Sequence, residues 1–165
     1  MTGIEAVMDY VREHELMLTT AESCTAGAII SLLATVPGCG SHVDAGYVVY
    51  SPAAKKRLLG VRQATLERFN LTSEEVVREM ALGALRDSEA NVVVANTGIA
   101  GPEGVDGIPP GTLWFAWGFQ IEGRLHLFTE LRRFFGDRET IIDTAARYAL
   151  AQLPSRHRRA VQGEG

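Results

Sequence analysis

The segment Asn91-Val92-Val93-Val94-Ala95-Asn96 constrains the fold of this chain more than any other. Its continuous apolar run has no polar face, so a strand made from it must be covered on both sides. Two shorter apolar segments, residues 16–20 and 43–50, predict further strands that precede it. A sheet that is buried on both faces needs helices on both faces, which is the arrangement of α/β domains.

The segments around these strands carry helical spacing or helix-capping residues. Helices are predicted over residues 4–12, 25–35, 52–59, 72–85 and 137–153. Residues 113–119 and 125–134 predict a late hairpin that turns at Glu122-Gly123. Early alternation of strands and helices, followed by a hairpin, predicts a three-layer α/β/α domain with a mixed, largely parallel sheet over residues 1–153.

Composition narrows the classes of function. A length of 165 residues suits one domain, and a net charge of −4 argues against a nucleic-acid-binding surface. Two cysteines without CxxC spacing and four scattered histidines argue against a disulfide framework and a metal site. No signal peptide and no membrane-spanning stretch is recognised, so a cytoplasmic protein is expected. Residues 154–165 are expected to form a disordered basic tail.

Ser23 lies in a hydroxyl-rich turn between a predicted strand and a predicted helix. Such a turn can hold a nucleophile together with free backbone N–H groups. The commonest role of a serine there is to cap the helix, and position alone favours that role. Cys24 is a rival nucleophile, although no histidine is close in sequence to activate it.

Lys55 follows Tyr50 by five positions, at the start of a predicted helix. Most lysines are solvated surface residues, and Lys56 is the natural example of that alternative. Burial would lower the pKa of Lys55 toward neutrality and make it a base. Tyr50 would ordinarily be a half-buried packing residue, but it can also pass a proton. Serine, tyrosine and lysine together suggest an amide hydrolase that uses neither metal nor histidine.

Two further features suggest a ligand site at the carboxyl ends of the strands. The loop that contains Thr97, Gly98 and Gly101 follows the most strand-like segment, and the turn at Ser23 follows another. Ligands of open α/β sheets bind at such ends, although glycines often serve only tight turns. Arg138 opens the last predicted helix, where an anion is favoured, but it is equally typical of a surface cap.

Five ordered motifs carry a resemblance to a known family. They are Ala21-Glu22-Ser23-Cys24-Thr25-Ala26-Gly27, Tyr50-Ser51-x-x-x-Lys55 with Leu59-Gly60-Val61, Thr97-Gly98-Ile99-Ala100-Gly101-Pro102, Gly111-Thr112-x-Trp114, and Phe135-Gly136-Asp137-Arg138. Together they closely resemble the CinA C-terminal family, the nicotinamide-nucleotide amidases, over residues 4–153.

The resemblance implies a Ser–Lys amidase that converts nicotinamide mononucleotide (NMN) to nicotinate mononucleotide and ammonia without a cofactor. It implies Ser23 as nucleophile, Lys55 as base and Tyr50 as proton relay. The residues implied to bind substrate are Thr25, Thr97, Gly98, Gly101 and Arg138. A homo-oligomer that binds neither nucleic acid nor membrane is expected.

Two departures from the family pattern and two rival functions remain at this point. Pro52 stands where the family often has asparagine, and Ile108 stands where a lysine is common. The second departure would make the site less cationic and puts affinity or the exact substrate in question. The rivals are a non-catalytic nucleotide-binding module and a serine hydrolase of another small amide.

Overall fold

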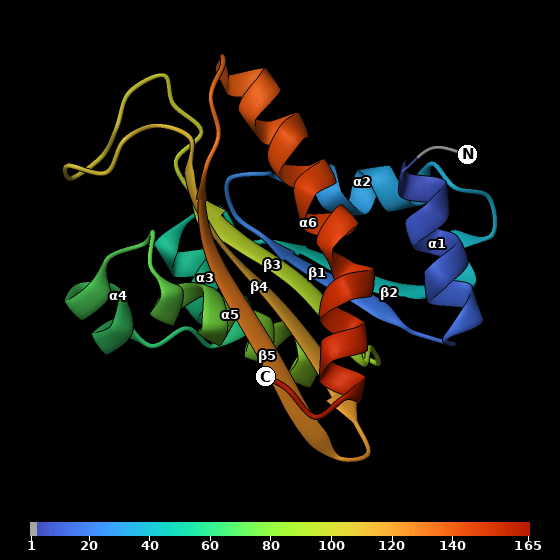
Figure 1. Ribbon diagram of the computed structural model, residues 1–165. Helices are drawn as coiled ribbons and strands as arrows, with labels where there is room; N and C mark the ends of the chain where they lie inside the picture. Colours follow the sequence, from blue (N-terminus) through green and yellow to red (C-terminus); the bar gives the residue numbers. More distant parts are fainter. Residues whose placement is uncertain (1–2) are drawn as a thin grey trace.

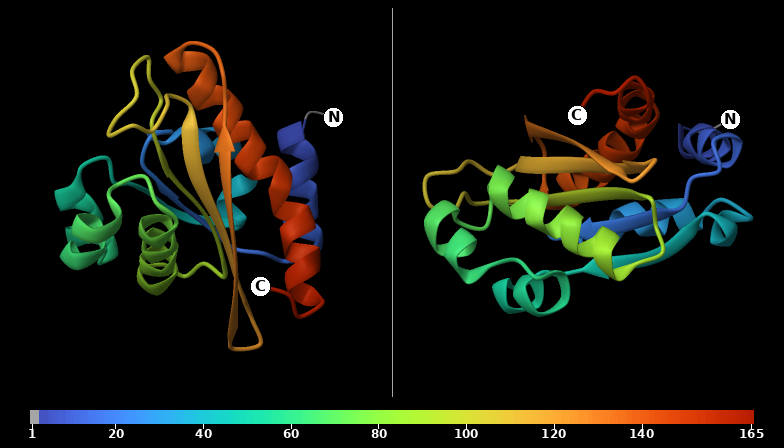
Figure 2. Two further views of the ribbon diagram at one scale, coloured as in Figure 1. Left: turned by 60° about the vertical axis from the view of Figure 1, so that its left-hand side comes forward. Right: turned by 90° about the horizontal axis from the view of Figure 1, so that it is seen from below.

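The computed structural model describes residues 3–165, which form a five-stranded sheet between two layers of helices (Figures 1 and 2). The strands are β1 (Leu18–Glu22), β2 (Val43–Val48), β3 (Val92–Gly98), β4 (Thr112–Ile121) and β5 (Arg124–Arg133). Their order across the sheet is β2-β1-β3-β4-β5, so the valine-rich β3 is central. Residues 1 and 2, where the domain was predicted to begin, lie outside the described residues.

The prediction of a mixed sheet in an α/β/α domain is confirmed, but "largely parallel" is too strong. β1 pairs in parallel with β2 and with β3, whereas β3, β4 and β5 pair antiparallel. β4 and β5 are joined by the tight turn at Glu122-Gly123, and strands joined by so short a turn must run in opposite directions. Two of the four strand pairings are therefore parallel and two are antiparallel.

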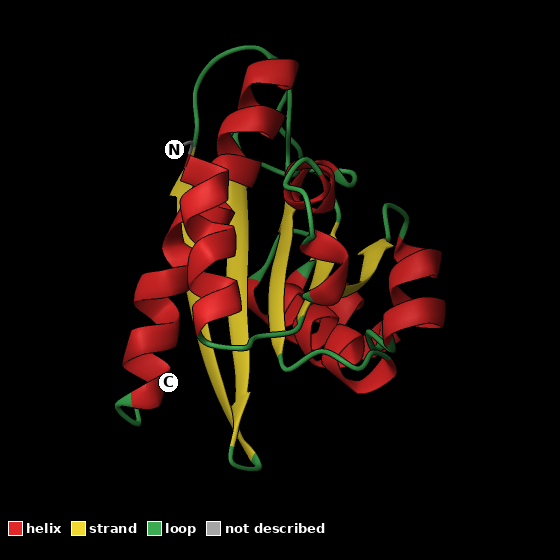
Figure 3. Ribbon diagram, turned by 90° about the vertical axis from the view of Figure 1, so that its right-hand side faces the viewer, coloured by secondary structure: helices red, strands yellow, loops and turns green. Residues whose placement is uncertain are grey.

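Each face of the sheet has its own apolar core. One face is covered by α1 (Gly3–Glu13), α2 (Ala28–Ala34) and α6 (Arg138–Val161), as Figure 3 shows. The other face is covered by α5 (Glu74–Asp87), with α3 (Pro52–Leu59) and α4 (Gln63–Phe69) beside it. A short 3-10 helix, Cys39–Ser41, precedes β2. β3 contributes Val92 and Val94 to the first core and Val93 and Ala95 to the second, which explains its unbroken apolar run.

The expectation of a disordered tail is wrong for the residues that continue α6 as far as Val161. Pro154 lies inside this helix, although proline usually marks a helix end. His157 and Ala160 are buried, and the Arg156 guanidinium donates to the Glu130 carboxylate on β5. This tertiary packing outweighs the local cost of the proline. None of the helices within residues 3–165 combines the length and apolar character needed to cross a membrane.

Candidate active site

The Ser23 turn and the glycine-rich loop meet at one edge of the sheet. β1 and β3 are parallel neighbours, with Glu22 opposite Asn96, so both chains leave the sheet at the same end. The Ser23 N–H donates to the Asn96 carbonyl at 3.2 Å and ties the two exits together. A cavity of about 510 Å³ opens there, lined by residues of both segments. This is the crevice in which open α/β sheets bind ligands.

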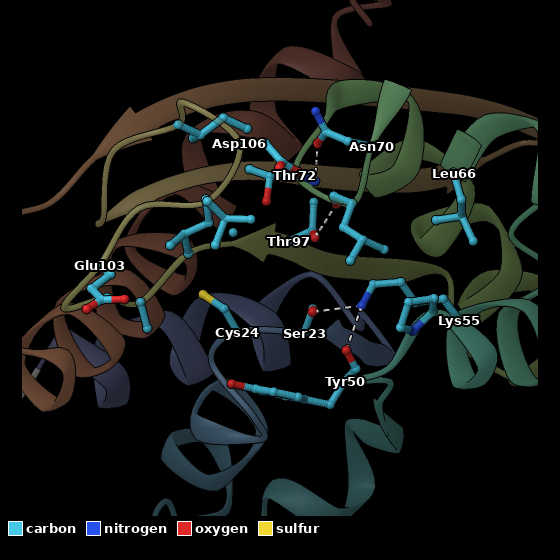
Figure 4. Close-up of a pocket in the computed structure, with 18 of the residues that line it drawn as sticks. Ser23, Cys24, Tyr50, Lys55, Leu66, Asn70, Thr72, Thr97, Glu103 and Asp106 are labelled. Atoms are coloured by element: carbon cyan, nitrogen blue, oxygen red, sulfur yellow. Dashed lines mark hydrogen bonds between the residues drawn. The ribbon is translucent and has the colours of Figure 1, made fainter. Parts of the chain in front are cut away.

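A serine and a lysine lie in direct contact at the floor of this cavity (Figure 4). Lys55 Nζ is 2.9 Å from Ser23 Oγ, and it donates to the main-chain carbonyls of Val49 at 2.9 Å and Tyr50 at 3.1 Å. α3 carries Lys55 and begins at Pro52, whose fixed φ suits the first turn, so the departure at this position is structurally accommodated. The Lys55 side chain is only 1% exposed.

The environment of Lys55 favours its neutral form. Burial lowers the pKa of Lys55 from 10.5 to about 8, and only an ionised Cys24 would oppose this shift by its charge. All three oxygen contacts of the amine are with neutral groups, so no carboxylate restores the charge. Lys56, in contrast, points outward and donates to Gln63 at 2.7 Å. A neutral amine at 2.9 Å can accept the Ser23 proton.

The Tyr50 side chain does not link this pair. Its hydroxyl accepts a hydrogen bond of 2.7 Å from Arg138 Nη2, whereas Lys55 contacts only the Tyr50 carbonyl. Because Lys55 already touches Ser23, the geometry provides a direct path for the proton. The predicted relay through the Tyr50 hydroxyl is absent from this arrangement.

Cys24 lines the cavity but has the character of a packing residue. It is 4% exposed, and burial raises the pKa of its thiol to about 12. The positive charges of Arg138 and Lys55 lower that pKa by less than burial raises it. The thiolate is the reactive form of cysteine, and at neutral pH this thiol is protonated. The electrostatics therefore favour Ser23 as the nucleophile.

A buried glutamate, not Ser23, holds the start of the next helix. α2 begins only at Ala28, after Gly27 in the left-handed region at φ 95°. The Glu22 carboxylate accepts from the N–H groups of Ile29 at 2.9 Å and Ile30 at 3.1 Å. The capping role that competed for Ser23 thus belongs to its neighbour. Sequence reasoning missed Glu22, although an acidic residue shortly before a helix is a recognisable signal.

Thr25 is buried and is not among the residues that line the cavity. Its hydroxyl donates to Glu22 at 2.7 Å and accepts from Asn96 Nδ2 at 2.7 Å. This network is fully buried and joins the turn to β3. The geometry thus gives Thr25 a structural role in place of the predicted contact with substrate.

Thr97, Gly98 and Gly101 do line the cavity. The Thr97 hydroxyl donates to the Leu71 carbonyl at 2.7 Å, and this hydrogen bond links β3 to the turn that forms another wall of the cavity. A Cβ at Gly98 would lie 2.6 Å from the Thr112 carbonyl oxygen, and Gly101 has a φ of 91°. Both glycines are therefore required by the backbone path of the loop.

Arg138 connects three parts of the cavity wall. Asp137 caps α6 by accepting from the Thr140 N–H at 2.8 Å, and this places Arg138 on the first turn. The Arg138 guanidinium donates to the Gly101 carbonyl and to the Tyr50 hydroxyl. A guanidinium carries five N–H donors, so donors remain for an anion in the cavity.

The outer wall of the cavity comes from a segment that sequence reasoning did not assign. α4 and the turn after it contribute Gln63, Leu66, Glu67, Asn70, Leu71 and Thr72. α4 has only seven residues, too short for a clear helical period. Ile108, the second departure from the family pattern, also lines the cavity. Within residues 3–165, no three histidine, cysteine or acidic side chains are placed to hold a metal ion.

Comparisons with known proteins agree with this architecture. A model of the CinA C-terminal domain matches residues 2–156. The chain is 46% identical over 140 residues to Protein YdeJ of Escherichia coli K12, covering 84% of this chain and 79% of the relative. It is 42% identical over 134 residues to the nicotinamide-nucleotide amidohydrolase PncC of Pseudomonas putida, covering 81% of each. The crystal structure of competence damage-inducible protein A from Klebsiella pneumoniae aligns with a TM-score of 0.87 at 39% identity, covering 93% of each chain.

Proposed function

The chain belongs to the CinA C-terminal domain family, and from this premise we propose that it is a nicotinamide-nucleotide amidohydrolase. The relatives that bear this name are 38–44% identical to it over most of its length. The observation that carries the chemistry is the 2.9 Å contact between Ser23 Oγ and Lys55 Nζ, an amine whose pKa burial lowers to about 8. A serine beside an uncharged lysine is an activated nucleophile for acyl transfer.

The proposed reaction proceeds through an ester on Ser23. Neutral Lys55 takes the proton of Ser23 as Oγ attacks the carboxamide carbon of NMN. The tetrahedral intermediate collapses, and Lys55 returns the proton to the departing nitrogen, which leaves as ammonia. Water, deprotonated in turn by Lys55, then attacks the ester carbonyl; nicotinate mononucleotide is released as Lys55 returns that proton to the departing Ser23 Oγ.

The oxyanion requires backbone donors, and the structure narrows their choice. Two N–H groups on the first turn of α2, those of Ile29 and Ile30, donate to the Glu22 carboxylate and are not available. In the preceding turn, the N–H groups of Ser23 and Ala26 are also bonded to carbonyls. Cys24 follows the nucleophile and lines the cavity, so we assign the oxyanion to its N–H.

Arg138 is the proposed phosphate contact. It is the cavity-lining arginine, it stands on the first turn of α6, and it retains free N–H donors. Thr97, Gly98 and Gly101 shape the wall beside it and are proposed to contact substrate.

The expected cytoplasmic location and homo-oligomeric state also stand as proposals, and light scattering of the purified protein measures the oligomeric state.

The test is ammonia release from NMN by the purified protein, with nicotinate mononucleotide identified as the second product. Ser23→Ala removes the attacking oxygen, and loss of such a nucleophile costs on the order of 10⁶ in rate. Cys24→Ala is the matched control and is expected to retain most of the activity. Turnover that survives in Ser23→Ala and vanishes in Cys24→Ala would contradict the assignment. NMN binding without ammonia release would indicate a non-catalytic nucleotide-binding module, and ammonia from other small amides alone would indicate a different hydrolase.

A further inference from the structure

The Tyr50 ring is an exposed aromatic surface inside the cavity, and the chemical steps above leave it without a role. It lines the cavity together with Ser23 and Lys55, yet the residue is 53% exposed. A large aromatic ring usually buries its area against other side chains. An exposed ring in the wall of a binding cavity instead offers its face to a ligand.

Two contacts hold this ring in place at its ends. The hydroxyl is fixed by the 2.7 Å hydrogen bond from Arg138, and the backbone is fixed by the bond from Lys55 Nζ to the Tyr50 carbonyl. Neither contact covers the ring face. Figure 4 shows the ring nearly edge-on, with one face turned toward Ser23 and Cys24. A flat ligand whose reacting group is at Ser23 can therefore lie against this face.

The charges around the cavity favour a cation in that position. Glu67, Glu103 and Asp106 line the outer part of the cavity. Against these three carboxylates the lining has two cationic side chains, Lys55, whose pKa burial lowers to about 8, and Arg138, which is placed at the hydroxyl end of Tyr50. An aromatic face attracts a cation through its quadrupole, and nearby carboxylates add to that attraction.

We propose that the face of Tyr50 binds the positively charged pyridinium ring of the substrate and makes the site selective for ring-charged carboxamides over neutral aromatic ones. This inference rests on the proposed function, because it takes the NMN ring as the ligand. It replaces the proton-relay role with a specificity role. The face of Tyr50 orients the pyridinium ring so that its carboxamide faces Ser23. Arg138 holds the Tyr50 ring in place through the hydrogen bond to its hydroxyl.

The experiment measures binding without turnover. In a Ser23→Ala background, calorimetry gives Kd for NMN and for its neutral isostere, in which a benzamide ring replaces the pyridinium ring. The same titrations are made with Tyr50→Leu, which removes the aromatic face, and with Tyr50→Phe, which keeps the face and loses only the hydroxyl. Tyr50 is half exposed, so neither variant opens a cavity in the core.

Tyr50→Leu is expected to weaken NMN binding about tenfold, within the range of cation–π contacts, and to change isostere binding by less than about twofold. Tyr50→Phe is expected to keep the preference for NMN. Equal weakening of both ligands, or a preference that survives in Tyr50→Leu, would overturn the proposal, as would failure of the Ser23→Ala protein to bind NMN. Failure of the proposed function is recognised separately, as the absence of ammonia release by the wild type.

Discussion

Lys55 and Lys56 are adjacent residues of the same type, and their surroundings give them different chemistry. The Lys55 amine is buried beside Ser23, whereas Lys56 Nζ donates to Gln63 at the surface. Burial removes the hydration that stabilises the ammonium ion, which is why the pKa of Lys55 falls to about 8. The same free energy that destabilises the charged lysine makes it available as a base.

The pH dependence of activity should follow this lysine. Because the neutral amine is the proposed base, kcat/KM for NMN is expected to rise with pH and level off above about 8, the pKa that burial gives Lys55. Lys55→Arg should be inactive, since a guanidinium does not lose its proton at working pH. Lys56→Ala is the control and should keep the wild-type profile. Equal losses in the two lysine variants would contradict the role of Lys55.

Stability should respond to the same group with a defined sign. The pKa of Lys55 is lower in the folded state, about 8 against 10.5, so between these values the unfolded chain binds more protons. The free energy of unfolding of the wild type should then rise with pH relative to Lys55→Met, by at most about 1.4 kcal/mol per unit. Urea unfolding of both proteins from pH 7 to 10.5 measures this, and parallel curves would show that Lys55 titrates normally.

Arg138 should control selection for the phosphate. A charge-assisted hydrogen bond contributes about 1.5–3 kcal/mol, so its loss should cost roughly tenfold to a hundredfold in kcat/KM for NMN. Nicotinamide riboside, which lacks the phosphate, should lose much less when Arg138 is replaced by alanine. The ratio of kcat/KM for the two substrates is the measurement. An unchanged ratio would place the phosphate on the glycine-rich loop at residues 97–101.

At the scale of elements, the junction of β1 and α2 depends on one carboxylate. Glu22 is fully buried and binds the Thr25 hydroxyl and the N–H groups of Ile29 and Ile30. α2 has seven residues and therefore little stability of its own. Its position, and with it the path of the Ser23 turn, follows from this cap.

Glu22→Ala should leave these donors buried without an acceptor. The expected loss in free energy of unfolding is about 2–4 kcal/mol, because several buried hydrogen bonds disappear together. A second variant, Thr25→Val, removes only the hydroxyl link and should cost less. Urea unfolding compares the two, and a midpoint for Glu22→Ala equal to that of the wild type would contradict the capping role.

At the scale of the whole molecule, the chain end is part of the domain. α6 crosses the full length of the sheet, and its last turns lie beside β5, as Figure 1 shows. The Arg156 guanidinium stacks over Trp117 at 4.9 Å, and His126 Nδ1 is 2.7 Å from the Glu164 carbonyl. These contacts join the end of the chain to the hairpin of β4 and β5.

Deletion of residues 154–165 should therefore lower the thermal midpoint of unfolding. The deletion exposes the core beneath His157 and Ala160, and loss of such burial costs at least about 2 kcal/mol. The cavity is lined by other segments, so kcat/KM for NMN should change little at temperatures where the shortened protein is folded. Removal of a disordered tail would leave the midpoint unchanged, and that outcome would contradict the structure.

Local signals identified most elements because they depend on neighbours a few positions apart. The valine run of β3, the Pro52 and Gly60 ends of α3, and the Asp137 cap of α6 all follow from backbone geometry and helical or strand periods. The predicted end of the last helix before Pro154 was wrong. The cost of a proline inside a helix was considered without the burial of His157 and Ala160, which offsets it. α4 was missed because seven residues give no clear period.

By itself the sequence determined the types of most elements, the two-sided burial of the sheet and, through its motifs, several of the residues that line the cavity. The tertiary structure decided which of those residues meet and how deeply each is buried. It brought Lys55 to Ser23 across 32 positions and Arg138 to Tyr50 across 88, and it moved the helix cap from Ser23 to Glu22. The physical reason is that pKa values and hydrogen bonds depend on burial and distance. These are properties of strand order and packing, which no local pattern specifies.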